Sequence, residues 1–306
     1  IDLNKSARVI KSIYCSFVFL IKYFNEKNII LIAYESNIFA IFLSKILGIP
    51  VIVRSNASPI GYLKNKFKKY IFMFFFRYAN LVLVNSKEFK YKIDNILKIK
   101  SKILYNSIIE KSLLKKLSNQ KTLKINLPNK TYKIIIIGRL VDQKDHITSL
   151  KALNLLKNKI NFYTIIIGKG ELIDNLKKFC KKNKLSSKIK FLGFKKNIYP
   201  YLKWSDALIL SSKYEGCPNV LIEAISMNKI AISSNCSTGP KEILKNGKAG
   251  FLFKTSDYKS LAKKIEVSYL NKKITLQKKI FAKKTIYRFS IDKNSRKLIQ
   301  YIDNLE

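Results

Sequence analysis

The sequence predicts an α/β protein with parallel β-sheets, divided between two domains. The isoleucine-rich run at 135–138 recurs at 165–168, thirty residues later, and this spacing fits one strand–helix–strand unit. Continuous isoleucine runs of this kind are typical of strands that helices cover on both faces. A chain of 306 residues is long enough for two such domains, each with its own core.

Residues 1–118 are expected to form the first domain. Gly48 follows a helical apolar pattern as a C-cap would, and Ser86 precedes another helix as an N-cap would. Because the chain begins with Ile, we expect a missing or processed N-terminus and an incomplete first domain. The expected strands are 29–33, 49–53, 81–84 and 103–105, and the expected helices include 38–47 and 62–79.

The second domain is expected over residues 119–289, after a linker at 112–131 that is rich in Lys, Ser and Asn. Its apolar runs and helical patterns alternate as a doubly wound parallel sheet requires. A last helix is expected within 290–306. The expected strands are 135–138, 165–168, 188–192, 207–210, 230–234 and 250–253. The expected helices include 172–183, 198–203, 257–269 and 274–287, with another face at 147–156, one after Pro218 and a helix start at Pro240.

The composition is strongly basic: 60 Lys and Arg against 19 Asp and Glu give a net charge of +41, and only six of the basic residues are Arg. A surface that recognises bases, or that binds phosphates through two N–H donors at once, would be richer in Arg, so nucleic-acid binding is not expected. Attraction to an anionic membrane surface is the better expectation. The longest apolar runs, 14–21 and 70–76, are too short to span a bilayer, and the four cysteines suggest neither a metal site nor a disulfide framework.

The stretch 205–227 is the most informative part of the chain. An apolar strand leads through a loop into a helix with Pro218 at its first position, where the missing N–H of proline is tolerated. The free backbone N–H groups of a helix start bind anions, and here they belong to Cys217, Asn219 and Val220. The carboxylates of Glu215 and Glu223 flank this point, which indicates a ligand with a phosphate end and a hydroxyl-rich end.

Further candidate site residues follow the two repeated isoleucine runs. Gly138 lets the backbone approach a ligand, while Arg139 and Lys144 can pair two phosphates. Gly168 and Gly170 open the next helix, although a G-x-G pattern alone is weak evidence.

The segment EGCPNVLIEA, following an apolar strand, resembles the donor-site signature of the retaining nucleotide-sugar glycosyltransferases of family 4. The resemblance covers about 25–290 and is most specific over 134–253. It implies the GT-B fold, in which two Rossmann-like, doubly wound domains face each other across a cleft. The second domain would bind a nucleoside-diphosphate sugar, with UDP favoured, and the first a glycan or lipid-linked acceptor. The last helix would cross back to the first domain.

The resemblance also implies roles for individual residues. Arg139 and Lys144 would bind the diphosphate and stabilise its departure, so that no metal or other cofactor is expected. Glu223 would accept hydrogen bonds from the ribose, and Glu215 would face the transferred hexose or N-acetylhexosamine; the catalytic residues are therefore expected to be Glu215, Arg139 and Lys144. The other donor contacts are expected at Gly138, Gly168, Gly170, Phe194, Asn197, Gly216, Cys217, Pro218, Asn219 and Val220. The 237–242 segment resembles a pattern found near the donor sugar in enzymes of bacterial surface-polysaccharide synthesis.

Some features leave alternatives open. The only histidine, His146, is expected to cap a helix or lie at the surface. Many relatives carry a functional His in a first-domain loop, where this sequence has Asn56, and an earlier glycine-rich loop of the family is absent. Asn cannot exchange a proton at neutral pH. An inactive GT-B-like basic module that binds an anionic membrane or RNA is therefore the alternative to a transferase, and an epimerase or phosphorylase is a third possibility.

The basic, aromatic helix expected at 62–79 has two interpretations: it lies in a membrane interface, or it is a core helix with a solvated Lys end. Since many family members act on lipid-linked acceptors, the expected location is cytoplasmic, with peripheral association at the inner face of the cell membrane.

Overall fold

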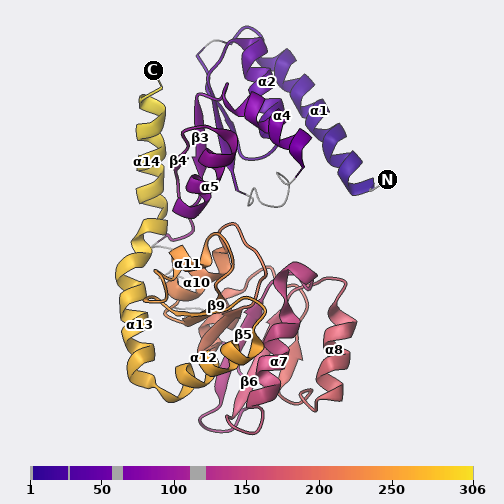
Figure 1. Ribbon diagram of the computed structural model, residues 1–306, viewed down its shortest axis with the longest axis vertical. Coiled ribbons are helices and arrows are strands. Elements are labelled where there is room, and N and C mark those ends of the chain that lie inside the picture. The colour runs from indigo at the N-terminus through magenta and orange to yellow at the C-terminus, as the bar shows by residue number, and fades with distance from the viewer. Residues whose placement is uncertain (1–2, 27, 57–64, 111–121, 306) are drawn as a thin grey trace. The chain divides into compact units, whose positions relative to one another are not determined.

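The computed structural model describes residues 3–26, 28–56, 65–110 and 122–305, and its chain divides into two compact units (Figure 1). One unit comprises Ile1–Tyr105 with Arg296–Glu306, and the other comprises Asn106–Ser295. The division falls after Tyr105 rather than after 118, because the segment behind Tyr105 is tied to the second unit. Ile109 forms a parallel bridge with Ser290 there. The expected boundary at 118 and residues 112–121 of the expected linker lie outside the described residues.

The first unit contains a four-stranded parallel sheet in the order β1-β2-β3-β4. Each strand pairs in parallel with its successor in the sequence, as the predicted strand–helix–strand pattern requires. The strands are β1 (Leu31–Ala33), β2 (Val51–Ser55), β3 (Leu81–Val84) and β4 (Lys102–Ile103). The helices are α1 (Leu3–Tyr23), α2 (Asn37–Leu47), α4 (Lys66–Phe76) and α5 (Lys87–Leu97).

Local signals set the helix ends of this unit as predicted. Gly48 adopts a left-handed φ of 68° and its N–H donates to Ser44 O, while the Ser86 hydroxyl accepts from the N–H of Phe89 at 3.2 Å. One sheet face packs against α2, α4 and α5. The other face packs against the end of α14 (Ile291–Asp303), whose Leu298 and Tyr301 contact the sheet residues Ile52 and Leu83 among others.

The second unit contains a six-stranded parallel sheet in the order β10-β9-β8-β5-β6-β7. The repeated isoleucines lie side by side in it, since Ile135 pairs with Ile165 and Ile136 with Ile166. The strand order reverses between β5 and β8, the arrangement of a Rossmann fold. The strands are β5 (Tyr132–Ile137), β6 (Phe162–Ile167), β7 (Ile189–Phe191), β8 (Ala207–Leu210), β9 (Ile230–Ser234) and β10 (Phe251–Phe253).

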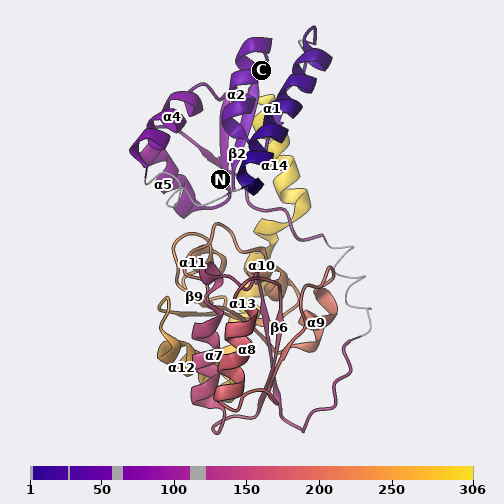
Figure 2. The ribbon, with the colours of Figure 1, turned by 90° about the vertical axis from the view of Figure 1, so that its right-hand side faces the viewer.

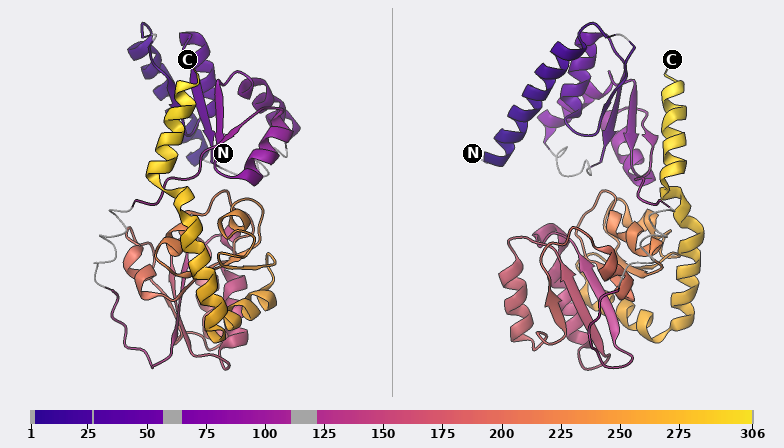
Figure 3. Two further views of the ribbon diagram at one scale, coloured as in Figure 1. Left: turned by 90° about the vertical axis from the view of Figure 1, so that its left-hand side faces the viewer. Right: turned by 180° about the vertical axis from the view of Figure 1, so that it is seen from behind.

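Helices cover both faces of this sheet (Figures 2 and 3). One face packs against α7 (His146–Leu156), α8 (Ile173–Lys182) and α12 (Tyr258–Leu270). The other packs against α9 (Tyr199–Trp204), α10 (Asn219–Ser226) and α13 (Lys272–Thr285), and α11 (Pro240–Ile243) follows β9. The predicted α/β class with two Rossmann-like units is therefore confirmed. In the described ranges no helix combines the length and apolar character needed to cross a bilayer.

Candidate functional site

Two loops meet at the carboxyl ends of β5 and β8, where the strand order reverses. β5 and β8 are neighbours in the sheet, so residues 138–146 and 211–218 leave the sheet side by side. Gln143 joins the two loops, because its carbonyl accepts from the N–H of Lys213 at 2.8 Å and its side-chain amide donates to Tyr214 O at 2.9 Å. In open parallel sheets this is the point at which ligands bind.

The centre of the site is an ion pair between Lys144 and Glu215. Lys144 Nζ lies 2.5 Å from Glu215 Oε1, and the two side chains are only 17% and 8% exposed. The Ser212 hydroxyl donates to the same carboxylate oxygen at 2.6 Å, and the Thr238 hydroxyl donates to the Glu215 carbonyl. A carboxylate this deeply buried requires such partners, and they hold Glu215 in one position.

Arg139 has an exposed side chain beside this pair. Its Nη2 donates to the Gln143 side-chain oxygen at 3.2 Å, which ties the guanidinium to the residue that bridges the two loops. Five N–H donors in a planar fork make Arg well suited to bind a phosphate that approaches from solvent.

His146 is 2% exposed, so the expectation that it caps a helix or lies at the surface is wrong. The chain turns back at Asp145, which has a left-handed φ of 46°, and this turn places the imidazole under the preceding loop. His146 Nε2 lies 2.9 Å from Arg139 O, and burial lowers the pKa of the imidazole. The neutral ring therefore donates to the Arg139 carbonyl and supports the loop that carries the guanidinium.

The two glycines after β6 are required by a close approach of backbones. A Cβ on Gly168, whose φ is +153°, would lie 1.8 Å from Gly138 O, and a Cβ on Gly170 would lie 2.3 Å from Leu140 O. The N–H of Leu140 donates to Lys169 O at 2.8 Å, so the loops after β5 and β6 are joined directly. Packing alone thus explains both glycines.

The start of α10 lies one residue later than expected. Pro218 is the N-cap, with φ −70° and ψ 100°, and Asn219 is the first helical residue. The loop after β9 packs against this point, since a Cβ on Gly239 would lie 2.7 Å from Gly216 O. Cys217 is half-buried in the loop between β8 and α10.

The loop after β7 reaches the side of α10. Burial raises the pKa of the half-buried Glu223 carboxyl. The pKa of the Tyr199 phenol is also raised, mainly by burial and to a smaller extent by the nearby charge of Glu223. Asn197 Oδ1 accepts from the N–H of Tyr199 at 3.1 Å, which holds the Asn197 side chain at the start of α9. Phe194 lies in the same loop and is 65% exposed.

Sequence reasoning missed three residues of the site: Gln143, Tyr199 and Ser212. Ser212 follows β8 as part of a polar pair at a strand end, which is a usable signal. Thr238 belongs to the 237–242 segment that the resemblance associated with a donor sugar. Among the residues that the structure describes, no group of three or more His, Cys, Asp or Glu is placed to hold a metal ion.

The chain matches a known protein family over most of its second unit. A profile of the family described as "Glycosyl transferases group 1" matches residues 118–285. An uncharacterized glycosyltransferase of Methanocaldococcus jannaschii is 36% identical over 202 residues, which cover 63% of this chain and 49% of that protein. The chain thus spans about half the length of that relative.

Two further similarities extend over both units. The N-acetylgalactosamine-N,N'-diacetylbacillosaminyl-diphospho-undecaprenol 4-alpha-N-acetylgalactosaminyltransferase of Campylobacter jejuni is 27% identical over 259 residues, covering 82% of this chain and 69% of that protein. The crystal structure of Anabaena HepE in complex with UDP matches the fold with a TM-score of 0.79 at 16% identity, covering 94% of this chain and 82% of that one.

Proposed function

Because the chain belongs to the glycosyl transferases group 1 family, we propose that it transfers a hexose or N-acetylhexosamine from a UDP-sugar, with retention of configuration, in the synthesis of a surface polysaccharide. We propose a glycan or lipid-linked oligosaccharide as the acceptor. The name of the Campylobacter relative, which includes a diphospho-undecaprenol acceptor, supports this class, and the UDP bound by the Anabaena protein supports the nucleotide.

One observation carries the proposal: the loops after β5 and β8 bring Arg139, Lys144 and the start of α10 to the switch point of one sheet. A diphosphate at this point would meet two cations and the free N–H groups of a helix start. The Lys144 ammonium has three N–H donors, so its bond to Glu215 leaves two for phosphate oxygens. The pair also fixes the position of the ammonium before a ligand arrives.

The proposed chemistry follows from this geometry. Arg139 and Lys144 would stabilise the negative charge that develops on the departing diphosphate, a role for which no metal ion is needed. Glu223, half-buried beside Tyr199, would accept hydrogen bonds from the ribose. Glu215, held by Lys144 and Ser212, would present its second carboxylate oxygen to the transferred sugar.

UDP binding, measured by calorimetry and thermal shift, tests the proposal. Arg139→Ala and Glu223→Gln should each weaken UDP binding at least about tenfold, because the first removes a cation from the diphosphate and the second replaces a charged acceptor of the ribose hydroxyls with a weaker neutral one. The exposed Lys178→Ala on α8 and the half-buried Glu266→Gln on α12 are matched controls and should bind UDP normally. Wild-type affinity in both site variants, or no UDP binding by the wild type, would contradict the donor site.

We also propose that the first unit associates peripherally with an anionic membrane. On α4 the side chains of Phe67, Tyr70 and Phe74 are 73%, 67% and 50% exposed, and Lys66 and Lys68 lie on the same helix. Exposed aromatic rings among lysines are typical of interfacial helices.

Co-sedimentation with phosphatidylglycerol-containing vesicles tests the membrane proposal. Phe67→Ser combined with Tyr70→Ser should reduce binding several-fold, whereas Tyr287→Ser, which removes an exposed ring of the second unit, should not. Equal binding by all three proteins would contradict a role for α4. Vesicle binding by a wild-type protein that fails to bind UDP would favour the inactive basic module instead.

A further inference from the structure

The position of Lys144 depends on the turn that joins the loop after β5 to α7. Residues Asp142–Lys144 form a short 3₁₀ turn, which ends where the N–H of Asp145 donates to Asp142 O at 3.1 Å. Asp145 then adopts a left-handed conformation, with φ 46° and ψ 46°, and α7 begins at His146. Residues other than Gly are uncommon in this conformation, so contacts of the side chain must hold Asp145 there.

The Asp145 side chain is anchored from two directions. Asp145 is 5% exposed, and its Oδ2 accepts from the Thr148 hydroxyl at 2.8 Å and from the Ser256 hydroxyl at 2.8 Å. Thr148 lies in the first turn of α7, whereas Ser256 is 111 residues further along the chain, between β10 and α12. A buried carboxylate requires hydrogen-bond donors, and these two fix Asp145 both to its own helix and to a distant loop.

The loop that carries Ser256 is itself held in place. Ser256 also has a left-handed φ, 59°, and the N–H of Asp257 donates to Lys254 O at 3.0 Å across this turn. Asp257 is the N-cap of α12, and its side chain accepts from the N–H of Ser260 at 2.9 Å. Because α12 packs against α7, the Asp145 carboxylate joins two fixed points of the second unit.

Two further contacts hold Lys144 from other sides. At the end of β8 the Ser211 hydroxyl donates to Lys144 O at 3.0 Å, and the buried Ser149 hydroxyl donates to Ser211 Oγ at 2.9 Å. A Cβ on Gly138 would lie 3.5 Å from Lys144 Cδ, so the lysine methylenes lie directly against this glycine. With its carbonyl held by Ser211 and the next residue held at Asp145, the side chain of Lys144 leaves the backbone in a fixed direction.

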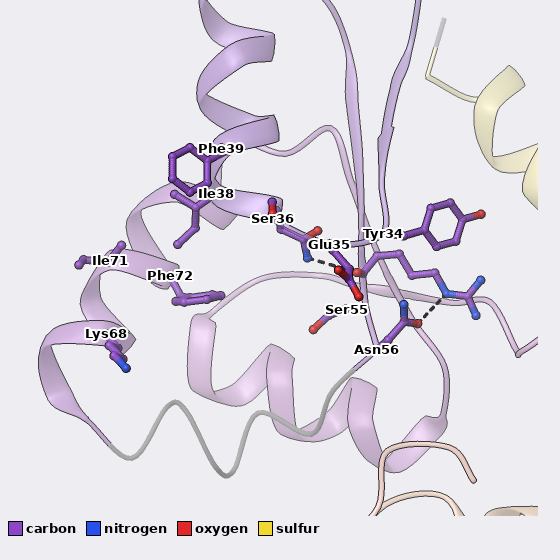
Figure 4. A pocket seen from close by; sticks show the side chains of 12 residues that line it. Tyr34, Glu35, Ser36, Ile38, Phe39, Ser55, Asn56, Lys68, Ile71 and Phe72 are labelled. Carbon is purple, nitrogen blue, oxygen red and sulfur yellow. Dashed lines mark hydrogen bonds between the residues drawn. The ribbon is translucent and has the colours of Figure 1, made fainter. Parts of the chain in front are cut away.

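A left-handed residue before a helix does not by itself distinguish this site. In the first unit Ser36, with φ 54°, precedes α2 in the same way after β1. Figure 4 shows Ser36 at the start of α2, among the side chains that line a cavity of about 590 Å³ at the carboxyl ends of β1 and β2. Asp145 is distinguished by its buried carboxylate, which accepts hydroxyl donors from two separate elements. The turn is therefore a feature of the fold, and the anchored carboxylate is the feature that a function must explain.

We infer that Asp145 is the positioning residue of Lys144. Anchored to Thr148 and Ser256, it holds the left-handed turn that directs the ammonium towards Glu215 and the diphosphate of the donor. The inference rests on the proposed function, which it deepens by naming a residue outside the ligand contacts that sets a cation in place. A charge that is positioned in advance needs no reorganisation when the leaving group departs. Without the anchor the turn can relax, and the ammonium then samples several positions.

The coupling between Lys144 and Glu215 measures this positioning without any ligand. It is obtained from the double-mutant cycle of Lys144→Met and Glu215→Gln in urea unfolding. In an Asp145→Gly background the turn is still permitted but the anchor is lost, so the coupling should fall to less than half its wild-type value. Asp145→Asn should retain most of the coupling, because the amide oxygen still accepts hydrogen bonds and Asn tolerates a left-handed φ.

Calorimetric titration with UDP measures the consequence for the diphosphate. Asp145→Gly should weaken UDP binding about tenfold, because the lysine then meets the diphosphate without a fixed orientation. Thr148→Val, which removes one of the two hydroxyl donors at nearly constant volume, should weaken it about threefold. Asp145→Asn should bind UDP nearly as well as the wild type.

Matched controls separate positioning from stability. Thr275→Val also removes a buried threonine hydroxyl of the second unit, one that donates to Ser268 O at 3.0 Å. Lys184→Gly also places Gly at a left-handed position, since the exposed Lys184 has φ 54°. Both controls should leave the Lys144–Glu215 coupling and the UDP affinity unchanged, even where they change the midpoint of unfolding.

Three outcomes would overturn the inference: an unchanged coupling in the Asp145→Gly background, equal losses of UDP affinity in Thr148→Val and Thr275→Val, or an Asp145→Asn variant as impaired as Asp145→Gly. Failure of the proposed function has a different signature. The wild type would then fail to bind UDP, while the unfolding cycle would still show whether Asp145 positions Lys144.

Discussion

The Lys144–Glu215 ion pair should stabilise the second unit in the absence of any ligand, and Lys144→Met isolates this effect. The substitution leaves a carboxylate that is 8% exposed with the Ser212 hydroxyl as its remaining side-chain donor. Breaking a buried pair from one side costs roughly 3–5 kcal/mol, and the 17% exposure of Lys144 reduces our expectation to about 2–3 kcal/mol. For a unit of this size the expected loss in Tm is roughly 5–10 °C.

Glu215→Gln should cost less, about 1–2 kcal/mol, because the neutral amide still accepts from Ser212 while the Lys144 ammonium retains some access to water. The variant that carries both Lys144→Met and Glu215→Gln should lose less stability than the two single variants do together. The difference should be about 1.5 kcal/mol or more, since no buried charge is then left without its partner.

Urea unfolding without nucleotide measures the cycle. Trp204 is the only tryptophan and is buried in the second unit, so its fluorescence reports the unfolding of that unit. Lys213→Met is the control, because its pair with Asp142 is 39% and 80% exposed and should contribute less than about 1 kcal/mol. Strict additivity of Lys144→Met and Glu215→Gln would show that the two charges do not interact and would refute the site geometry.

Three further predictions concern the glycines, the buried imidazole and metal ions. Gly168→Ala should destabilise the unit by about 3 kcal/mol or more, since its methyl would overlap Gly138 O, whereas Gly193→Ala (φ +67°, no atom within 4 Å) should cost only about 1 kcal/mol; equal losses in urea unfolding would contradict this. Because burial lowers the folded-state pKa of His146 below 6.5, only the unfolded chain takes up a proton just below pH 6.5. Stability should therefore fall from pH 6.5 towards 5.5 by up to about 1.4 kcal/mol per pH unit, and His146→Gln should flatten this slope; an unchanged slope would contradict the burial. Excess EDTA should leave UDP binding unchanged, because the Arg139 and Lys144 cations would neutralise the diphosphate; loss of binding that Mg²⁺ restores would contradict that role.

The sequence by itself determined most of the elements of this protein, although no helix was expected where α1 (Leu3–Tyr23) lies. The strands β3, β8 and β9 lie at their predicted bounds, because strands covered on both faces are continuous apolar runs that end in polar residues. The capping residues Gly48 and Ser86 act over only a few residues, so the end of α2 and the start of α5 could also be predicted from the sequence. The thirty-residue repeat even predicted the neighbouring strands β5 and β6.

Only the tertiary structure decided which side chains share a site. Lys144 and Glu215 are 71 residues apart, and their contact depends on β8 joining the sheet beside β5. The burial of His146 depends on a left-handed turn at Asp145. The cavity of the first unit combines residues from α2, α4 and two strand ends. The periodicity of apolar residues indicates whether each residue is buried and in which kind of element. Contacts between distant segments depend on how the elements pack, and a local sequence pattern gives no information about that.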